Sequence, residues 1–542
     1  MKKWIMLTLS ASVLAACQST PTTTQTPTTA NEPMHSAELP TTESAPVASA
    51  KIDTVDHLLN PELIAPVPAP VVKEVTPQQE ADLWQRIRRQ LTMHVPENDR
   101  VSAQRNFYLK HPAYMDRVAK RAAPFMHLIV EEIEQRGLPL ELALLPIVES
   151  AFDPFAYSHG SAAGIWQFIP GTARQYGLEI NWWYDGRRDV YSATHAALDY
   201  LTDLNNLFDN WLHALAAYNS GGGRVSSAIR RNQRAGKPTD FWSLDLPRET
   251  RAYVPKLLAL ADILRNQDTY QVSWLAIENQ PYLTLVETET QIDLALAAEQ
   301  AGLELEQLHH YNSGYNRWAT DPEGPHRLLL PQQNAQRLQQ WLAASDSRDL
   351  VRWSRHKVAS GESLIVIAKK YHTTPQAIQQ ANNIRGHLIR AGDYLLIPAA
   401  SRDLDDYSLS ADQRLSATQS RQRGSYKIDH TIVPGDTFWD LSRKYDVNLR
   451  QLAKWNGMAP TDPLRPGRKL VVWLSEDDKP SGVTRNIHYQ VRSGDSLARI
   501  AQRFNVTIGD IEKWNQIKRS NYLQPGQRLK LIVDVTRMTN DI

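Results

Sequence analysis

The stretch Leu142-Ala143-Leu144-Leu145-Pro146-Ile147-Val148-Glu149-Ser150-Ala151-Phe152 sets a carboxylate and a hydroxyl at the end of an apolar run. From Leu140 to about Gln267, apolar residues recur with helical periodicity, broken by Pro and Gly and without convincing alternating strands. Two polar motifs follow in this region, Gly164-Ile165-Trp166-Gln167 and Ala217-Tyr218-Asn219-Ser220-Gly221. We therefore predict one compact α-helical domain at residues 138–268, with a polar site built around one carboxylate.

Glu149 has the setting of a general acid. Cleavage of a glycosidic bond requires a proton for the leaving oxygen, which a carboxylic acid supplies only while it is protonated near neutral pH. Glu149 ends an apolar helix, where the helix dipole disfavours negative charge, and Val148, Phe152 and Trp166 are placed to limit its hydration. Both effects raise the carboxyl pKa. Taken alone, Glu149 would more often be a solvated residue that closes a helix.

The two later motifs supply what a sugar site needs. Gly164-Ile165-Trp166-Gln167 offers a flexible approach, a sugar-stacking surface and an amide that both donates and accepts hydrogen bonds. Ala217-Tyr218-Asn219-Ser220-Gly221 ends a helix with further polar groups at a glycine-rich turn. A lone Trp or Tyr is usually a core residue, but ordered motifs at these separations favour a glycan-cleaving site.

These motifs resemble those of the lytic transglycosylases of the lysozyme-like superfamily, over roughly Leu138 to Gln267. The family pattern has Glu-Ser, Gly-Leu-Met-Gln, Ala-Tyr-Asn and a later Tyr, which here falls on Tyr253 within Glu249-Thr250-Arg251-Ala252-Tyr253. Ile165 and Trp166 replace Leu and Met at packing positions.

The resemblance implies that Glu149 acts first as acid and then as base on the β-1,4 bond between N-acetylmuramic acid and N-acetylglucosamine. Muramic O6 then attacks C1 of the same sugar and leaves a 1,6-anhydro end without water. One carboxylate suffices, because the N-acetyl group of the substrate can stabilise the developing positive charge. By resemblance, Ser150 and Gln167 position the acid and the N-acetyl group, while Tyr218, Asn219 and Tyr253 orient the acid and the sugar.

Three other carboxylates, Asp153, Asp185 and Asp189, are possible second catalytic groups. We expect structural roles for them, such as turn or helix capping. If one faced the site, a hydrolytic muramidase or a chitinase-like enzyme would be possible, and a non-catalytic wall-binding protein is the alternative from another class. The His residues are scattered, so we predict no metal and no cofactor.

Length and composition indicate a protein of several domains. The 542 residues are 42% apolar and 22% charged, a normal globular mixture. The net charge of +1, without a basic run interleaved with aromatics, argues against nucleic-acid binding.

The N-terminus predicts export and lipidation. Lys2 and Lys3 precede an apolar stretch that ends at Ala16 and is too short to span a membrane, so residues 1–16 are expected to be a signal peptide. The sequence Leu14-Ala15-Ala16-Cys17 resembles the bacterial lipoprotein box, which implies cleavage before Cys17 and its acylation. The alternative for a lone cysteine is an inert buried thiol. Gln18 at the next position implies the outer membrane. Residues 17–70, rich in Thr and Pro, are expected to form a disordered tether.

An N-terminal helical region is expected at residues 71–137, before the helical domain. After that domain the sequence changes to a repeated pattern. Three copies of one pattern align on Gly361, Gly435 and Gly494, each with apolar residues at fixed helical offsets and an asparagine at plus twenty-one. A strand precedes each glycine and another closes each copy, which makes a β-α-α-β unit. The pattern resembles LysM modules, at residues 354–400, 428–474 and 486–534, with a linker at 401–425.

A fourth, divergent LysM-like module is expected at residues 280–345, where Gln291 stands in the place of the leading glycine. The predicted fold class is thus multidomain, with an all-α lysozyme-like catalytic domain followed by small α+β LysM modules. The resemblance implies peptidoglycan glycan strands as the partner. Binding is expected at the loops Gly361-Glu362-Ser363, Gly435-Asp436-Thr437 and Gly494-Asp495-Ser496, where acid and hydroxyl groups also cap helices.

Overall fold

The computed structural model describes residues 75–474, 484–504, 506–517 and 523–534. The predicted signal peptide, Cys17 and the tether to residue 70 lie outside the described residues. No helix in the described part of the chain combines the length and the apolar character needed to cross a membrane.

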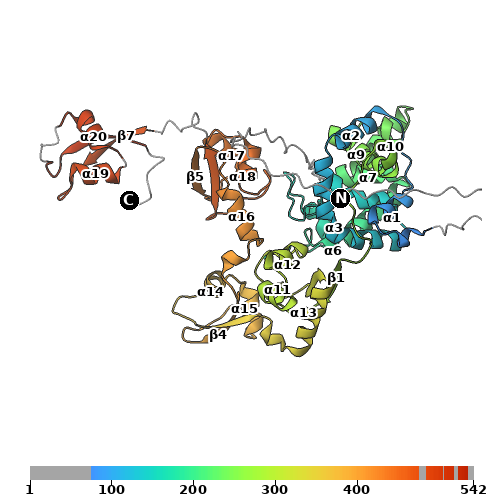
Figure 1. Cartoon of the computed structure of the whole chain (residues 1–542). Coiled ribbons are helices and arrows are strands. Elements are labelled where there is room, and N and C mark those ends of the chain that lie inside the picture. Colours follow the sequence, from blue (N-terminus) through green and yellow to red (C-terminus); the bar gives the residue numbers. More distant parts are fainter. Residues whose placement is uncertain (1–74, 475–483, 505, 518–522, 535–542) are drawn as a thin grey trace, which may run out of the picture. The chain divides into compact units, whose positions relative to one another are not determined.

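Ten α-helices make up the first body of the chain (Figure 1). They confirm the all-α character predicted for this region, and α3 lies within the N-terminal helical region expected at residues 71–137. The helices are α1 (Leu83–Arg89), α2 (Asp99–Leu109), α3 (Pro112–Gln135), α4 (Leu145–Ser150), α5 (Pro170–Gln175), α6 (Val190–Phe208), α7 (Trp211–Ser220), α8 (Gly222–Arg234), α9 (Arg248–Arg265) and α10 (Gln267–Tyr270).

One hydrophobic core joins the N-terminal helices to the domain that carries Glu149. Trp84 of α1, Phe125 of α3 and Leu258 of α9 are fully buried in the same cluster. The apolar residues of α3 recur every three to four positions, so that one stripe of the helix faces this core. Residues 75–137 therefore pack as part of the helical domain, and burial of this shared core fixes α4 against α9.

Four β-α-α-β units follow, and each has two antiparallel strands, which confirms the predicted fold class. The divergent unit contains β1 (Leu283–Glu287), α11 (Leu294–Ala301), α12 (Leu305–Tyr311), β2 (Arg327–Pro331) and the added helix α13 (Gln332–Ala344). The ordinary units contain β3 (Arg352–Lys357), α14 (Leu364–Lys370), α15 (Pro375–Ala381) and β4 (Tyr394–Ala399); β5 (Tyr426–Thr431), α17 (Phe438–Lys444), α18 (Leu449–Trp455) and β6 (Lys469–Leu474); and β7 (Thr484–Gln490), α19 (Leu497–Arg503), α20 (Ile508–Asn515) and β8 (Arg528–Asp534).

The repeated asparagine closes each unit. In the second ordinary unit, Asn456 donates from Nδ2 to the carbonyls of Leu452 (2.9 Å) and Val471 (2.8 Å) and accepts from the Val471 amide (2.7 Å). One side chain thereby ties the end of α18 to the middle of β6. Asn312, Asn382 and Asn515 make the same three contacts in the other units. The sequence repeat is thus a repeated hydrogen-bonded clamp.

The segment 401–425, expected to be a linker, contains ordered structure. It forms a short 3-10 turn and the helix α16 (Ala411–Ser420). Tyr407 is fully buried, and its hydroxyl donates to the carboxylate of Asp293 at the start of α11 (3.0 Å). The polar composition of this segment does not predict its ordered structure, because that structure depends on the packing of a single buried tyrosine.

Replacement of Asn456 by Ala is expected to destabilise the second ordinary unit by about 2–3 kcal/mol, since it leaves buried backbone groups of β6 without partners. Hydrogen exchange of the full chain checks this, as the amides of β5 and β6 should exchange faster. Asn515→Ala is the matched control, because the same clamp is partly exposed there and the effect in the third unit should be smaller. Unchanged exchange in β5 and β6 would contradict the role of the clamp.

Candidate active site

The end of α4 places Glu149 in the last helical turn. Ala151 (φ 52°) and Phe152 (φ 56°) adopt the left-handed conformation, and their amides donate back to the carbonyls of Ile147 and Pro146 (3.2 Å each). The side chain of Phe152 is fully buried and anchors this turn in the core. The helix end is therefore fixed on both sides of the carboxylate.

The carboxyl group of Glu149 meets the hydroxyl of Tyr253, which comes from α9 and donates to Oε1. Tyr253 is buried, whereas Glu149 keeps partial solvent access. Burial raises the pKa of Glu149 to about 8, against the opposing effect of the Tyr253 hydrogen bond. The predicted proton donor thus holds its proton at neutral pH, and the expected cause, loss of hydration, is the main one.

Two charged residues of α9 also act on this carboxyl group, and sequence reasoning missed both. The charge of Glu249 raises the pKa of Glu149, and the charge of Lys256 lowers it. They stand four residues before and three residues after Tyr253, the spacing that puts helical side chains on one face. That spacing was the signal available once Tyr253 had been assigned to the site.

Ser150 connects the first motif to the second. Its hydroxyl donates to the carbonyl of Ile165 (3.0 Å) and lies 3.3 Å from the carbonyl of Pro146. Tyr218 reaches the same loop from α7, with its hydroxyl donating to the carbonyl of Trp166 (2.8 Å). Consecutive carbonyls of one loop are therefore held by two of the predicted site residues.

Gly164 permits the tight path of this loop. It has a φ of 80°, and a Cβ built on it would lie 1.8 Å from the carbonyl oxygen of Arg187. Gln167 also has a left-handed φ, of 50°, and its amide Nε2 donates to the Gly164 carbonyl (2.8 Å). The glycine is thus needed for the close approach of the two backbone segments.

Trp166 is fully buried, so the expectation that this motif provides a sugar-stacking surface is wrong for it. Its indole nitrogen donates to the Thr194 hydroxyl of α6 (3.0 Å). The packing role predicted for this position holds instead, because a large ring with a satisfied N–H stabilises the core beneath the loop.

Asn219, at the end of α7, accepts a hydrogen bond from the buried Thr250 hydroxyl of α9 (2.8 Å). Thr250 was not predicted as a site residue, although it lies in the segment quoted for Tyr253. The side chains of the site that retain partial solvent exposure are Glu149, Ser150, Gln167, Tyr218 and Asn219. The structure thus collects the predicted polar residues from α4, the following loop, α7 and α9 around one protonated carboxyl group, an arrangement suited to general acid–base chemistry.

The three candidate second carboxylates are engaged elsewhere. Asp153 accepts from the Phe155 amide (3.0 Å), and Asp189 caps α6 through the Ser192 amide (3.0 Å). The carboxylate of Asp185 is buried between Arg187 and Arg188, with oxygen–nitrogen distances of 2.8 Å. The capping expected for Asp153 and Asp189 is confirmed, and Asp185 is an ion-pair residue.

Family comparisons agree with this organisation. The Transglycosylase SLT domain matches residues 128–241, and the LysM domain matches residues 356–398, 430–473 and 489–531. A family described as the LysM-like domain of lytic transglycosylase MltD matches residues 282–347, the stretch interpreted as a divergent copy.

The membrane-bound lytic murein transglycosylase D of Escherichia coli K12 is 38% identical over 412 residues, which cover 74% of this chain and 87% of that protein. The chain belongs to the lytic murein transglycosylase D family. Its repeats also match the cell wall-binding protein YocH of Bacillus subtilis, at 33% identity over 22% of this chain and 38% of that protein. A solved structure of an inactive mutant of lytic transglycosylase Slt from Pseudomonas aeruginosa matches 36% of this chain and 33% of its own, with 22% identity and a TM-score of 0.22.

The LysM loops of this lytic murein transglycosylase D family member share one construction. Gly361, Gly435 and Gly494 have φ values of 85°, 96° and 87°. The hydroxyl residue two positions after each glycine caps the first helix of its unit by accepting from the backbone amide of the third helical residue. These capping residues are Ser363, Thr437 and Ser496. The capping role predicted for the hydroxyls is confirmed.

The acidic residues of these loops are satisfied within their own units. Glu362 accepts from the Ala359 amide (2.7 Å) and lies 2.8 Å from His356 Nε2. Asp436 repeats this with Val433 and His430, and Asp495 does so with Arg492 and the Tyr489 hydroxyl. The carboxylates therefore shape the loops, which leaves backbone groups and neighbouring side chains as the atoms available to a ligand.

In the divergent unit, Asp293 takes the position of the capping hydroxyl. It is fully buried, and besides the amides of α11 its carboxylate accepts from the Ser401 amide (2.8 Å) and from Tyr407. The loop that is open in the ordinary units is therefore covered here by the segment that follows the first ordinary unit. In the described ranges, no group of three or more His, Cys, Asp or Glu is placed to hold a metal ion.

Glu149 should make the stability of the protein depend on pH. A carboxyl group whose pKa is about 8 when folded and near 4.5 when unfolded binds more protons in the folded state between these values, so stability falls as pH rises through this window. Glu149→Gln removes this penalty. We expect equal stability of the two proteins at pH 4.5, and an advantage of the variant that grows by up to about 1.4 kcal/mol per pH unit toward pH 8.

Thermal unfolding of both proteins across this pH range measures the difference. Glu179→Gln, at an exposed carboxylate of the same domain, should show no such growth. Parallel stability curves for Glu149→Gln and the parent protein would contradict a raised pKa at Glu149.

Proposed function

We propose that this lytic transglycosylase cleaves the β-1,4 bond between N-acetylmuramic acid and N-acetylglucosamine with Glu149 as its acid and base, and that it leaves a 1,6-anhydromuramic end. The proposal is supported above all by the state of the Glu149 carboxyl group, which is protonated at neutral pH and contacted by Tyr253. A group with this pKa can give its proton to the leaving oxygen and remain a competent base afterwards.

Two proton transfers, both through Glu149, are sufficient for a reaction within one sugar. In the first step the proton of Glu149 moves to the leaving glycosidic oxygen as the C1–O bond breaks. The N-acetyl oxygen of the substrate supports the positive charge at C1, so no enzyme nucleophile is required. In the second step the Glu149 carboxylate takes the proton of O6 while O6 bonds to C1. The Tyr253 hydroxyl stabilises the carboxylate between these steps by donating to it.

The remaining residues have positioning roles in this proposal. Ser150 and Tyr218 fix the loop that carries Gln167, and the amide of Gln167 has the donor and acceptor groups to hold the N-acetyl substituent. Asn219, oriented by Thr250, presents its amide nitrogen to the sugar. The engagement of Asp153, Asp185 and Asp189 in local contacts supports a route with a single catalytic carboxylate.

Glu149→Gln should lower peptidoglycan cleavage by at least about 100-fold, because it removes general acid and base catalysis while it keeps the shape of the side chain. Glu179→Gln serves as the control and should retain activity. The products of the parent enzyme, analysed by mass spectrometry, should carry 1,6-anhydro ends. New reducing ends would indicate a hydrolytic muramidase, and unchanged turnover by Glu149→Gln would indicate a binding protein whose helical domain is not the catalyst.

The three ordinary LysM modules bind peptidoglycan and hold the enzyme on its polymeric substrate. We place the glycan contacts at the loops that begin at Gly361, Gly435 and Gly494, where the internally bonded carboxylates fix the backbone. The divergent module has its corresponding loop covered by Ser401 and Tyr407, so its role in this proposal is packing against the catalytic domain.

We also propose that acyl chains on Cys17 anchor the enzyme in the outer membrane, facing the periplasm. The lipobox-like sequence and Gln18 support this location, and the Escherichia coli relative is named as membrane-bound. Cys17→Ser should move the protein from the membrane fraction to the soluble periplasm without loss of activity on isolated peptidoglycan. Retention of the variant in the outer-membrane fraction would refute the lipid anchor.

A further inference from the structure

A cavity of about 1060 Å³ lies outside the proposed catalytic residues. Its walls come from the catalytic domain, from the divergent LysM-like unit, from α16 and the turn before it, and from the second ordinary LysM unit. The hydroxyls of Tyr157 (2.9 Å) and Ser161 (2.5 Å), both in the catalytic domain, donate to the carboxylate of Asp462 in that LysM unit. These bonds join two of the walls directly.

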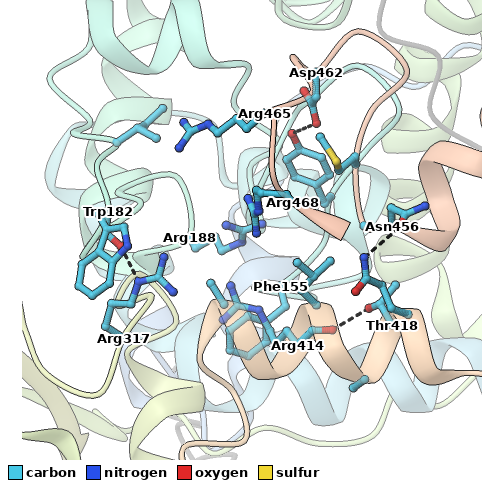
Figure 2. A pocket seen from close by; sticks show the side chains of 18 of the residues that line it. Phe155, Trp182, Arg188, Arg317, Arg414, Thr418, Asn456, Asp462, Arg465 and Arg468 are labelled. Atoms are coloured by element: carbon cyan, nitrogen blue, oxygen red, sulfur yellow. Dashed lines mark hydrogen bonds between the residues drawn. The ribbon is translucent and has the colours of Figure 1, made fainter. Parts of the chain in front are cut away.

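The charge of this cavity is strongly unbalanced. Seven cationic side chains and two carboxylates line it. Both carboxylates are already bonded, Asp462 to Tyr157 and Ser161 and Asp153 to the Phe155 amide. Figure 2 shows arginines from each of these walls around one space: Arg188 of the catalytic domain, Arg317 of the divergent unit, Arg414 of α16, and Arg465 and Arg468 of the loop between α18 and β6. Such a concave surface concentrates positive potential.

Two of these arginines carry positive charges that neighbouring carboxylates do not fully neutralise. Arg188 shares the carboxylate of Asp185 with Arg187, and its buried Nε has no hydrogen-bond partner among the described residues. Arg414 donates to the carbonyl of Leu409 and stacks at 4.6 Å on Phe155, and it forms no ion pair within the described ranges. Burial, together with the charge of Arg188, lowers the pKa of Arg414 to about 9. Cations held together out of water are unfavourable unless an anion joins them.

We propose that this cavity binds the carboxylates of the peptide stems of peptidoglycan, an inference that rests on the proposed function. Arginine forks pair with carboxylates in a bidentate manner, which suits a ligand with several such groups. The cavity is much larger than a small inorganic ion, and Phe155, Trp182 and Met458 add apolar wall for aliphatic parts of a peptide.

The origin of the walls favours a ligand that belongs to the polymer. One wall belongs to the domain that cuts glycan strands, and another includes the helix-to-strand loop of a module that binds them. A peptide that branches from a strand held by both would lie beside both. The cavity would then select strands that carry acidic peptides, a preference distinct from recognition of the sugars.

The test measures binding in the absence of turnover. The full chain with Glu149→Gln is titrated by calorimetry with the stem tripeptide L-alanyl-γ-D-glutamyl-diaminopimelate, with the same peptide after amidation of its carboxylates, and with inorganic phosphate. Arg414→Gln and Arg465→Gln are added singly and together, and the exposed Arg348→Gln outside the cavity is the matched control. Melting temperatures verify that each variant folds.

The expected result is binding of the acidic tripeptide only, weakened at least tenfold by the double substitution and unchanged by Arg348→Gln. Equal binding of the amidated peptide, undiminished binding by the cavity variants, or no binding of the tripeptide would overturn the proposal. Phosphate that binds as tightly as the peptide would also overturn it, in favour of a small-anion site. Cleavage of peptide-free glycan strands by the parent enzyme reports on the proposed function separately, since it does not require this cavity.

Discussion

The contact between the Tyr253 hydroxyl and the Glu149 carboxyl group is the constraint on which the site depends. It joins α9 to the end of α4 across 104 residues of sequence, and burial of the shared core holds those helices together. Loss of hydration raises the pKa of Glu149 and keeps its proton in place. The hydrogen bond from the Tyr253 hydroxyl acts in the opposite direction, because it stabilises the carboxylate once the proton has left. The two effects oppose each other, and the balance lies near neutral pH, where a group can act both as acid and as base.

Much of this arrangement could be predicted because it rests on periodicity and on local chemistry. Helical spacing predicts the helical domain, the polar motifs predict the residues around Glu149, and the repeated glycine and asparagine predict the β-α-α-β units. The role of Trp166 could not be predicted, because an indole ring suits a sugar surface and a core equally well and only its burial decides. Glu249 and Lys256 were missed because their effect on Glu149 depends on which face of α9 meets α4.

Whether a polar segment is ordered can depend on contacts with residues outside that segment. Residues 401–425 have the polar composition of a linker, yet Tyr407 fills a position in the core of the divergent unit and Arg414 stacks on Phe155 of the catalytic domain. A net charge of +1 likewise gives no sign of the basic cavity, because carboxylates elsewhere in the chain balance its arginines in the total. Composition reports averages, whereas these features depend on where a few side chains are placed.

The asparagine clamp bears on how repeat units of this kind can be duplicated during evolution. Because each copy binds its own last strand through its own side chain, the information needed for closure is contained between the first and last strand of that copy. A duplicated gene segment of that length would carry every residue of its own clamp. The clamp of Asn312 is present in a copy that has Gln291 in place of the leading glycine and carries the added helix α13, so the architecture tolerates both changes.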